Sequence, residues 1–443
     1  MNAALPIVEP EDATEAEPEL TTYAYSYPHK SSYRPLDPPV PIAEAWRRED
    51  TSRLSLYVHV PFCEMRCGFC NLFTQSRPEG GIVEAYLATL ARQMRVVREA
   101  VPQAIFRQFA VGGGTPTYLS AAQLESVFAR LESTFEVKVR DLDASVEVSP
   151  TTVSPDRLGV LADFGVKRIS IGVQSFLGSE TKQIGRPQRH ASVATALDRI
   201  RAAGFPVLNI DLIYGDPEQT RESWLASIRE ALRYRPEELY LYPLYVRPGT
   251  GLARVGWQAA RHRDDLYVAG RDCLADHGYE QASLRCFRLP REQAPSAYGC
   301  QRDGMIGLGC GARSYTQGLH YSSRFSVNQA GVRAILEDWV RQPDRDLAMA
   351  THGIRLDADE QLRRFLILSL LQAEGMTLAE FAARFPGSDP EDMPEVRGLI
   401  ERGWLLREAD RLVLSPEGLQ HSDTVGPLLY SPPVRERLRE FVR

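Results

Sequence analysis

The sequence predicts an α/β protein built on a mainly parallel sheet, followed by a small helical domain. Segments typical of strands and of helices alternate regularly between residues 54 and 245. Such alternation indicates a parallel sheet with covering helices. Polar or glycine-rich residues also stand at the end of each predicted strand. The C-terminal part differs, because helical periodicity there is broken by only two short strand-like segments.

Six strands and the helices between them make up the repeating part. We expect strands at 54–60, 105–111, 144–148, 168–173, 207–213 and 239–245, and helices near 82–100, 120–135, 154–165, 190–203 and 220–233. Ser120 and Gln123 form a capping-box pattern that opens one of these helices. Its expected apolar face is Leu124, Val127, Phe128, Leu131 and Phe135. Periodicity leaves open whether the sheet closes into a barrel or stays a partial barrel.

The strand ends hold the candidate functional residues. In parallel sheets such residues gather at the carboxyl ends of the strands. Here those ends carry a cysteine-rich run, the loop GGGTPT at 112–117, Glu147, Gln174, Asp211 and the segment 242–245. Because all six strands show this feature, we expect one site at one end of the sheet.

The cysteine-rich run is YVHVPFCEMRCGFC, in which Cys63, Cys67 and Cys70 follow a Cys-x3-Cys-x2-Cys spacing. Iron–sulfur clusters are normally held by four thiolates, so three leave one iron open to another ligand. The alternatives are three buried thiols or part of a zinc knuckle. Zinc motifs usually need a second cysteine pair downstream, and none follows here. Cys273, Cys286, Cys300 and Cys310 lack close spacing, so we expect them to be buried thiols.

Composition narrows the class of protein. The chain has 443 residues, with 52 Lys and Arg against 58 Asp and Glu, for a formal charge of −6. A mildly acidic chain argues against nucleic-acid binding. The first residues lack the pattern of a signal peptide, and no apolar run is long enough to cross a bilayer. We therefore expect a cytoplasmic protein without membrane or nucleic-acid partners.

Both ends of the chain differ from the repeating part. Residues 1–22 are acidic and proline-rich, which predicts disorder. The next segment, TYAYSYPHKSSYRPLDPPVP, is either an extended arm that lies on the protein or a plain linker. From Asp357 we expect helices and a two-stranded wing formed by 404–406 and 411–414. Winged helices often bind DNA, but this segment has more acidic than basic residues. We divide the chain into 1–50, 51–350 and 355–435.

Together these motifs resemble the radical S-adenosylmethionine (SAM) superfamily, and more narrowly its oxygen-independent coproporphyrinogen III dehydrogenase-like (HemN-like) family. The matching segments are YVHVPFCEMRCGFC, GGGTPTYLS, SVEVSP, RISIGVQSF, GRPQRH, NIDLIYG, YPLYVRPGT and GLGCGARSY. The resemblance implies a partial (β/α)6 barrel with a small, helical, winged-helix-like C-terminal domain. It also implies that the arm reaches a substrate pocket.

The resemblance implies roles position by position. Cys63, Cys67 and Cys70 would hold a 4Fe–4S cluster, and Tyr57 and Phe69 would contact a first SAM. Gly113, Gly114 and Thr115 would bind the amino-acid end of that SAM. The other implied SAM-binding residues are Glu147, Gln174, Arg186 and Asp211, with Ile213 and Pro243 at the site of a second SAM.

The implied activity is reductive cleavage of SAM to a 5′-deoxyadenosyl radical, which attacks a porphyrin-like or other conjugated substrate. A reductant such as flavodoxin or ferredoxin would supply the electron. Cys70 is followed by Asn71-Leu72-Phe73, whereas the coproporphyrinogen enzymes have a further cysteine close by. The outcome is therefore open between decarboxylation or dehydrogenation and radical methyl or methylene transfer with a second SAM. The alternative from another class is a haem-binding chaperone of the HemW type.

Overall fold

The computed structural model describes residues 26–258, 260, 262–290 and 304–442. The predicted disordered segment 1–22 lies outside these residues, as does Cys300. A single 13-stranded sheet runs through the larger part, in the order β1-β15-β14-β13-β12-β2-β5-β6-β7-β8-β9-β11-β10. Its two outermost strands, β1 and β10, do not pair with each other, so the sheet is open. The partial barrel is confirmed.

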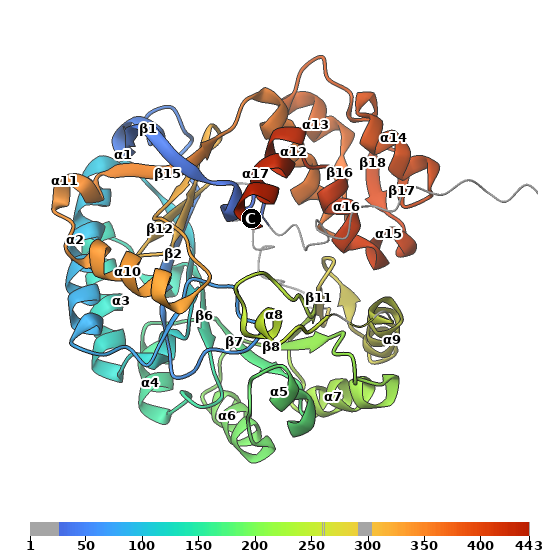
Figure 1. Ribbon diagram of the computed structural model, residues 1–443, viewed down its shortest axis with the longest axis horizontal. Coiled ribbons are helices and arrows are strands. Elements are labelled where there is room, and N and C mark those ends of the chain that lie inside the picture. The colour runs from blue at the N-terminus through green and yellow to red at the C-terminus, as the bar shows by residue number, and fades with distance from the viewer. Residues whose placement is uncertain (1–25, 259, 261, 291–303, 443) are drawn as a thin grey trace, which may run out of the picture.

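The six predicted strands form the parallel centre of the sheet. They are β2 (Leu54–Val60), β5 (Phe106–Gly113), β6 (Asp143–Val148), β7 (Arg168–Gln174), β8 (Val207–Tyr214) and β9 (Glu238–Pro243). Helices lie around the outside of the curve (Figure 1). These are α2 (Ile82–Ala100), α3 (Ala121–Phe135), α4 (Pro155–Asp163), α5 (Gly178–Gln183), α6 (His190–Ala202), α7 (Arg221–Arg233) and α9 (Arg263–Asp276).

Strands from later in the chain extend both edges. β12 (Met305–Leu308) pairs in parallel with β2 and adds a seventh parallel strand. Beyond it lie the antiparallel strands β13 (Arg313–Tyr315), β14 (Leu319–Ser322), β15 (Met349–Arg355) and β1 (Arg34–Pro41). The other edge carries β11 (Cys286–Arg288) and β10 (Glu280–Gln281). Short connecting helices are α1 (Ile42–Trp46), α8 (Gly251–Arg254), α10 (Gln329–Val340) and α11 (Asp344–Leu347).

The two faces of the sheet are buried to different degrees. On β6, Ala144, Val146 and Val148 are buried on the helix-covered side, whereas Glu147 on the inner side is exposed. On β9, Tyr240 and Tyr242 are only partly buried. Side chains alternate between the faces of a strand, so the outer face carries the core. The inner face is thereby left accessible for ligands.

Helix α3 shows the local features that made the helices predictable from the sequence. The Ser120 hydroxyl oxygen accepts a hydrogen bond from the Gln123 backbone amide, and Gln123 Oε1 accepts one from the Ser120 backbone amide. These two bonds form the predicted capping box. The predicted apolar residues Leu124, Val127, Phe128, Leu131 and Phe135 are all buried. Each such side chain contributes about 1.5–3 kcal/mol when fully buried. The capping box therefore sets where α3 begins, and the burial of one apolar face stabilises the helix in the fold.

The C-terminal part has its own hydrophobic cluster. It contains α12 (Ala358–Leu370), α13 (Leu378–Arg384), α14 (Pro394–Glu401), α15 (Pro416–Gln420), α16 (Ser422–Leu428) and α17 (Pro432–Val442). The predicted wing is present, because β17 (Leu405–Glu408) pairs antiparallel with β18 (Arg411–Leu414). β16 (Met376–Thr377) adds a third strand. Among the described residues, no helix has the length and apolarity needed to cross a bilayer.

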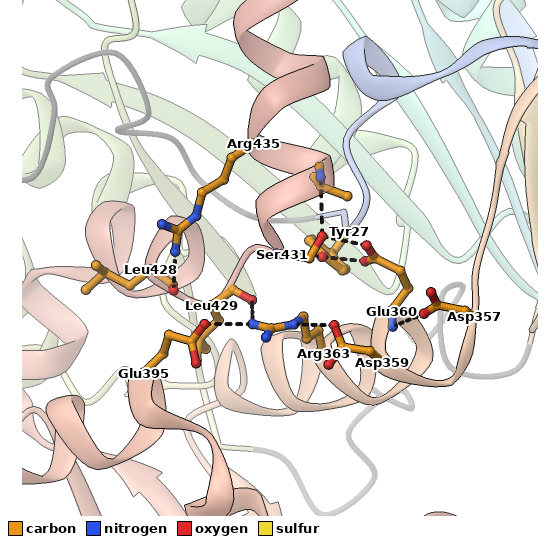
Figure 2. Close-up of polar contacts among 11 residues, drawn as sticks. Tyr27, Asp357, Asp359, Glu360, Arg363, Glu395, Leu428, Leu429, Ser431 and Arg435 are labelled. Atoms are coloured by element: carbon orange, nitrogen blue, oxygen red, sulfur yellow. Dashed lines mark hydrogen bonds and ion pairs between the residues drawn. The ribbon is translucent and has the colours of Figure 1, made fainter.

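The segment before β1 is an arm packed on the protein, not a free linker. Tyr27 is buried and donates its hydroxyl to the Glu360 carboxylate at 2.5 Å, while the Ser431 amide donates to the Tyr27 hydroxyl at 3.1 Å (Figure 2). The Ser431 hydroxyl also donates to Glu360, at 2.5 Å. Figure 1 shows the arm beside α17, near the middle of the molecule. The arm thus joins the sheet to the C-terminal helices.

Tyr27→Phe should loosen the arm. A hydrogen bond to a charged group contributes about 1.5–3 kcal/mol, so local opening should become roughly 10–100 times more frequent. Hydrogen exchange measured by mass spectrometry should show faster exchange of the Ser32 and Tyr33 amides, which bond within the arm. Tyr234→Phe, outside the arm, is the matched control. Unchanged exchange in Tyr27→Phe would show that this hydroxyl does not hold the arm.

Candidate functional site

The cysteine-rich run forms a loop at the carboxyl end of β2. Its Gly68 amide donates to the carbonyls of Ile184 and Gly185 at 3.1 and 3.2 Å, and the Gly68 carbonyl accepts from Leu252 at 2.9 Å. The Arg66 guanidinium donates to the carbonyls of Cys70, Thr74 and Val327. Hydrogen bonds to residues 184–185, 252 and 327 therefore hold the backbone of the loop without a disulfide.

Each cysteine thiol of the loop lies beside a polar group. The Thr115 hydroxyl donates to Cys63 Sγ at 3.6 Å, and Arg186 Nη1 donates to Cys67 Sγ at 3.3 Å. Cys70 Sγ lies 3.8 Å from Thr74 Oγ1. Burial raises the pKa of Cys63 to about 12 and also raises the pKa of Cys67. A positively charged metal centre would reverse this effect and favour the thiolates.

These thiols fit a cluster better than a single ion. In the described part of the chain, no three His, Cys, Asp or Glu side chains converge closely enough to hold one metal ion. A cluster does not require such convergence, because each thiolate binds a different iron. Cys63, Cys67 and Cys70 still lie close enough for Cys67 and Cys70 to affect the pKa of Cys63. All three are free and only partly buried, so they remain open to a ligand.

The glycine loop after β5 is hydrogen-bonded to the cysteine strand. Gly114 donates its amide to the Val60 carbonyl at 2.8 Å, and Thr115 donates to the Phe62 carbonyl at 2.8 Å. A Cβ on Gly114 would lie 2.6 Å from the Phe62 carbonyl oxygen, so no larger residue fits there. Gly113 has a φ of +106°, which favours glycine, and a Cβ there would overlap the His59 imidazole.

Two carboxyl groups face the interior of the barrel. Glu147 accepts from the Gly113 amide at 3.1 Å, and Asp211 accepts from Ser170 at 3.2 Å and from Asn209 at 2.7 Å. Burial of the carboxyl groups against the barrel wall raises the pKa of Glu147 to about 7 and that of Asp211 to about 6. The Glu147 side chain is nevertheless reachable by solvent along the inner face. Both groups are placed to accept hydrogen bonds from a ligand inside the barrel.

Gln174 and Arg186 meet at the end of β7. Gln174 is buried with a φ of +69°, next to a shift in the pairing of β7 with β8. Arg186 Nη2 donates to the Gly172 carbonyl at 2.7 Å, while its Nη1 reaches Cys67. The sequence resemblance implied a SAM contact for Arg186. In the structure this side chain links the cysteine loop to β7.

An apolar wall completes the site. Phe69 packs against a small hydrophobic cluster that includes Ile213 and Leu252. Pro243 ends β9 directly opposite Tyr214 and is buried. Tyr57 points its hydroxyl at His59 Nδ1, at 3.2 Å, from the centre of β2. Tyr57, Glu147, Asp211 and Ile213 thus lie on the inner side of the sheet, towards its carboxyl ends, whereas Pro243 lies on the same, outward face of β9 as Leu239 and Leu241.

Sequence reasoning missed the basic residues beside the site. Lys30 lies on the arm, in the short helix η2 (Lys30–Ser32), Arg247 follows β9, and Arg313 begins β13. None is part of a periodic pattern. All three lie in segments that matched the family, SYPHKSSYRPL, YPLYVRPGT and GLGCGARSY, but no role was assigned to them. Cys286 and Cys310 are buried and Cys273 is partly buried, and none of the three is hydrogen-bonded to the cysteines of the loop.

The raised pKa of Glu147 predicts that the stability of the SAM-free protein depends on pH. Its folded-state pKa, about 7, is above its ordinary value of 4.5, so folding favours the protonated form. This contribution is present below about pH 4.5 and is lost as the pH rises through about 7. Glu147→Gln should therefore raise the melting temperature at pH 8 and raise it less at pH 5, and the effect should be small because solvent reaches the Glu147 side chain. Glu125→Gln on the exposed side of α3 is the control, and equal shifts at both pH values would contradict the assignment.

Comparison with known proteins finds two family models in the chain. Residues 57–231 match the family model described as the Radical SAM superfamily, and residues 356–421 match the HemN C-terminal domain. The oxygen-independent coproporphyrinogen III oxidase of Pseudomonas aeruginosa is 27% identical over 432 residues, which is 90% of each chain. The heme chaperone HemW of Lactococcus lactis is 27% identical over 381 residues, 84% of this chain and 96% of that one.

A comparison of folds also gives a match over most of the chain. The solved structure of HemN from Escherichia coli, a coproporphyrinogen III oxidase, has a TM-score of 0.74 to this chain with 24% identity. It covers 87% of this chain and 92% of its own. The chain therefore carries a radical SAM domain at residues 57–231 and a HemN C-terminal domain at residues 356–421, and the radical SAM family implies a 4Fe–4S cluster and SAM as cofactors.

Proposed function

We propose that this radical SAM protein is an oxidoreductase that removes hydrogen from a porphyrin-like or other conjugated substrate. The observation that carries the proposal is the meeting of the cysteine loop and the glycine loop at the end of a sheet whose inner face is accessible. The likeness to coproporphyrinogen III oxidases over nine-tenths of the chain suggests the substrate class. A small electron carrier such as flavodoxin or ferredoxin is the proposed reductant.

When bound and reduced, the cluster with SAM supplies a 5′-deoxyadenosyl radical that abstracts a hydrogen atom from the substrate. The protein supplies position and surroundings. Cys63, Cys67 and Cys70 are the proposed cluster ligands. Thr115 and Arg186 donate hydrogen bonds to two of their sulfurs, which stabilises the thiolate form.

The remaining side chains orient SAM. The Gly113–Thr115 backbone is the proposed contact for its amino-acid end, and Glu147 and Asp211 are the proposed acceptors. Phe69 and Ile213 form an apolar boundary that keeps water from the reacting atoms. Tyr57 and Gln174 lie on the same inner side and complete the proposed SAM contacts.

The outcome on the substrate has two forms. Asn71 stands where the strict coproporphyrinogen enzymes continue their cysteine run, which weakens the case for decarboxylation. Methyl or methylene transfer needs a second SAM, for which Ile213 and Pro243 are the proposed contacts. Haem binding is the second candidate function, favoured by the 27% identity to HemW over most of the chain.

Cys67→Ala tests the cluster assignment. Anaerobically reconstituted wild-type protein with dithionite and SAM should release 5′-deoxyadenosine. Losing a partner outside the ligand shell typically costs roughly 10–100-fold in metal affinity or activity, so losing a ligand should reduce this product at least about a hundredfold. Cys273→Ala, a cysteine on α9 outside the loop, is the matched control. Wild-type rates in Cys67→Ala would overturn the proposal.

The products of the reaction would identify both the substrate and the type of reaction. Coproporphyrinogen III incubated with the active protein should release carbon dioxide if the reaction is decarboxylation. SAM labelled in its methyl group should transfer label to the product if the reaction is methylation. Stoichiometric haem binding without any 5′-deoxyadenosine would favour the chaperone candidate and reject the enzyme.

A further inference from the structure

A layer of polar side chains lies directly beneath Asp211 in the interior of the barrel. Ser170 of β7 and Asn209 of β8 are register partners, two residues before the pair formed by Gly172 and Asp211. Asn209 is completely buried, and Ser170 is 6% exposed. Residues two apart on a strand share a face, so Asn209 lies on the same inner face as Asp211. The layer therefore lies between the proposed SAM site and the amino ends of the strands.

Both oxygens of the Asp211 carboxylate accept a hydrogen bond from this layer. Asn209 Nδ2 donates to Asp211 Oδ1 at 2.7 Å, and Ser170 Oγ donates to Asp211 Oδ2 at 3.2 Å. Asn209 Nδ2 also donates to Ser170 Oγ at 2.8 Å, so the three side chains form a closed ring of hydrogen bonds. The ring fixes the orientation of the carboxylate, and each oxygen keeps a lone pair for a further donor. Asp211 is only partly buried, so a ligand can reach it.

The amide of Asn209 makes these bonds at the expense of its own oxygen. Among the described residues, the buried Asn209 Oδ1 has no hydrogen-bond partner. Turning the amide over would place Oδ1 against the Asp211 carboxylate, where two acceptors would face each other. A buried polar atom without a partner is unfavourable, and a side chain needed only for packing would be apolar. The amide is therefore placed for what it donates to Asp211.

Charged and titratable side chains face Asp211 from the neighbouring strands β6, β7 and β9, and these are Glu147, Arg168, Glu238 and Tyr240. Burial raises the pKa of Asp211, and so does Glu238, whereas Arg168 lowers it. The hydrogen bonds from Asn209 and Ser170 also lower it, and the pKa comes to about 6. Near neutral pH the carboxylate is therefore mainly ionised, in the form that only accepts hydrogen bonds.

We propose that Asn209 is a positioning residue for SAM: together with Ser170, it holds the Asp211 carboxylate ionised and oriented to accept from a hydroxyl or amino group of SAM. This rests on the proposed function, because Asp211 is a SAM contact only in that function. The competing role is barrel filling, in which the layer stabilises the sheet and does not affect the ligand. The two roles differ in whether the effect of Asn209 on SAM passes through Asp211.

Equilibrium dialysis of SAM against the reconstituted, unreduced protein tests the proposal without turnover. Asn209→Leu keeps the size of the side chain but removes its donors. It should weaken SAM binding by about tenfold, since residues that act through a neighbour change affinity by roughly twofold to thirtyfold. Ser170→Ala removes the other donor to Asp211, should weaken binding in the same way, and carries the test if Asn209→Leu does not fold. Ser227→Ala, which removes a fully buried hydroxyl on the outer helix α7, should bind SAM as wild type.

A double-mutant cycle separates positioning from barrel filling. Asp211→Ala should weaken SAM binding at least as much as Asn209→Leu. The double variant should bind no worse than Asp211→Ala alone, because residues that act as one unit do not give additive losses. Losses that multiply in the double variant would show that Asn209 does not act through Asp211, and would overturn the proposal.

The pH dependence of SAM binding is a second readout. Wild-type affinity should fall as the pH drops through the pKa of Asp211, because the ionised form is the acceptor. Asn209→Leu removes donors that lower this pKa, so the midpoint should move to higher pH. Glu147 titrates nearby but is the same in both proteins. An unshifted midpoint, or wild-type affinity in both Asn209→Leu and Ser170→Ala, overturns the proposal. Formation of 5′-deoxyadenosine by the wild type would then leave the proposed function intact.

Discussion

Two backbone hydrogen bonds join the glycine loop to the cysteine strand, and the rest of the site depends on them. Gly114 and Thr115 donate to the carbonyls of Val60 and Phe62, both at 2.8 Å. The approach is close enough that a Cβ on Gly114 would collide with the backbone. The proposed cluster ligands and the proposed contact for SAM therefore move as one unit. Thr115 then adds a hydrogen bond to the Cys63 sulfur itself.

The open side of the barrel is completed by segments far apart in the sequence. The arm crosses from the sheet to the C-terminal helices, where Tyr27, Glu360 and Ser431 fix it (Figure 2). The next residues of the arm place Lys30 against Phe325, two residues before Val327, whose carbonyl accepts from Arg66 of the cysteine loop. A change in the packing of the C-terminal helices would therefore reach the cysteine loop through the arm. This gives the C-terminal domain a role in the site without a direct contact to the cluster.

The sequence predicted the parallel strands, the covering helices and the wing because each has a strong local pattern. The end of the sheet that carries the site was also predictable, since Gln174 ends β7 and Glu147 and Asp211 lie in the C-terminal halves of β6 and β8. The seventh parallel strand was not, because β12 has four residues and includes a glycine. Lys30 and Arg313 are nearly 300 residues apart, and their segments meet through the long-range pairings of β1 with β15, β15 with β14 and β14 with β13. Periodicity carries no information on such contacts.

The central claim is that three thiolates hold a cluster whose fourth iron is open to SAM. Electron paramagnetic resonance of the reduced, reconstituted protein, recorded with and without SAM, tests it most directly. We expect the signal of a reduced 4Fe–4S cluster, and we expect SAM to change its shape because SAM binds the open iron. A cluster signal that SAM leaves unchanged, or no cluster signal after reconstitution, would contradict the account.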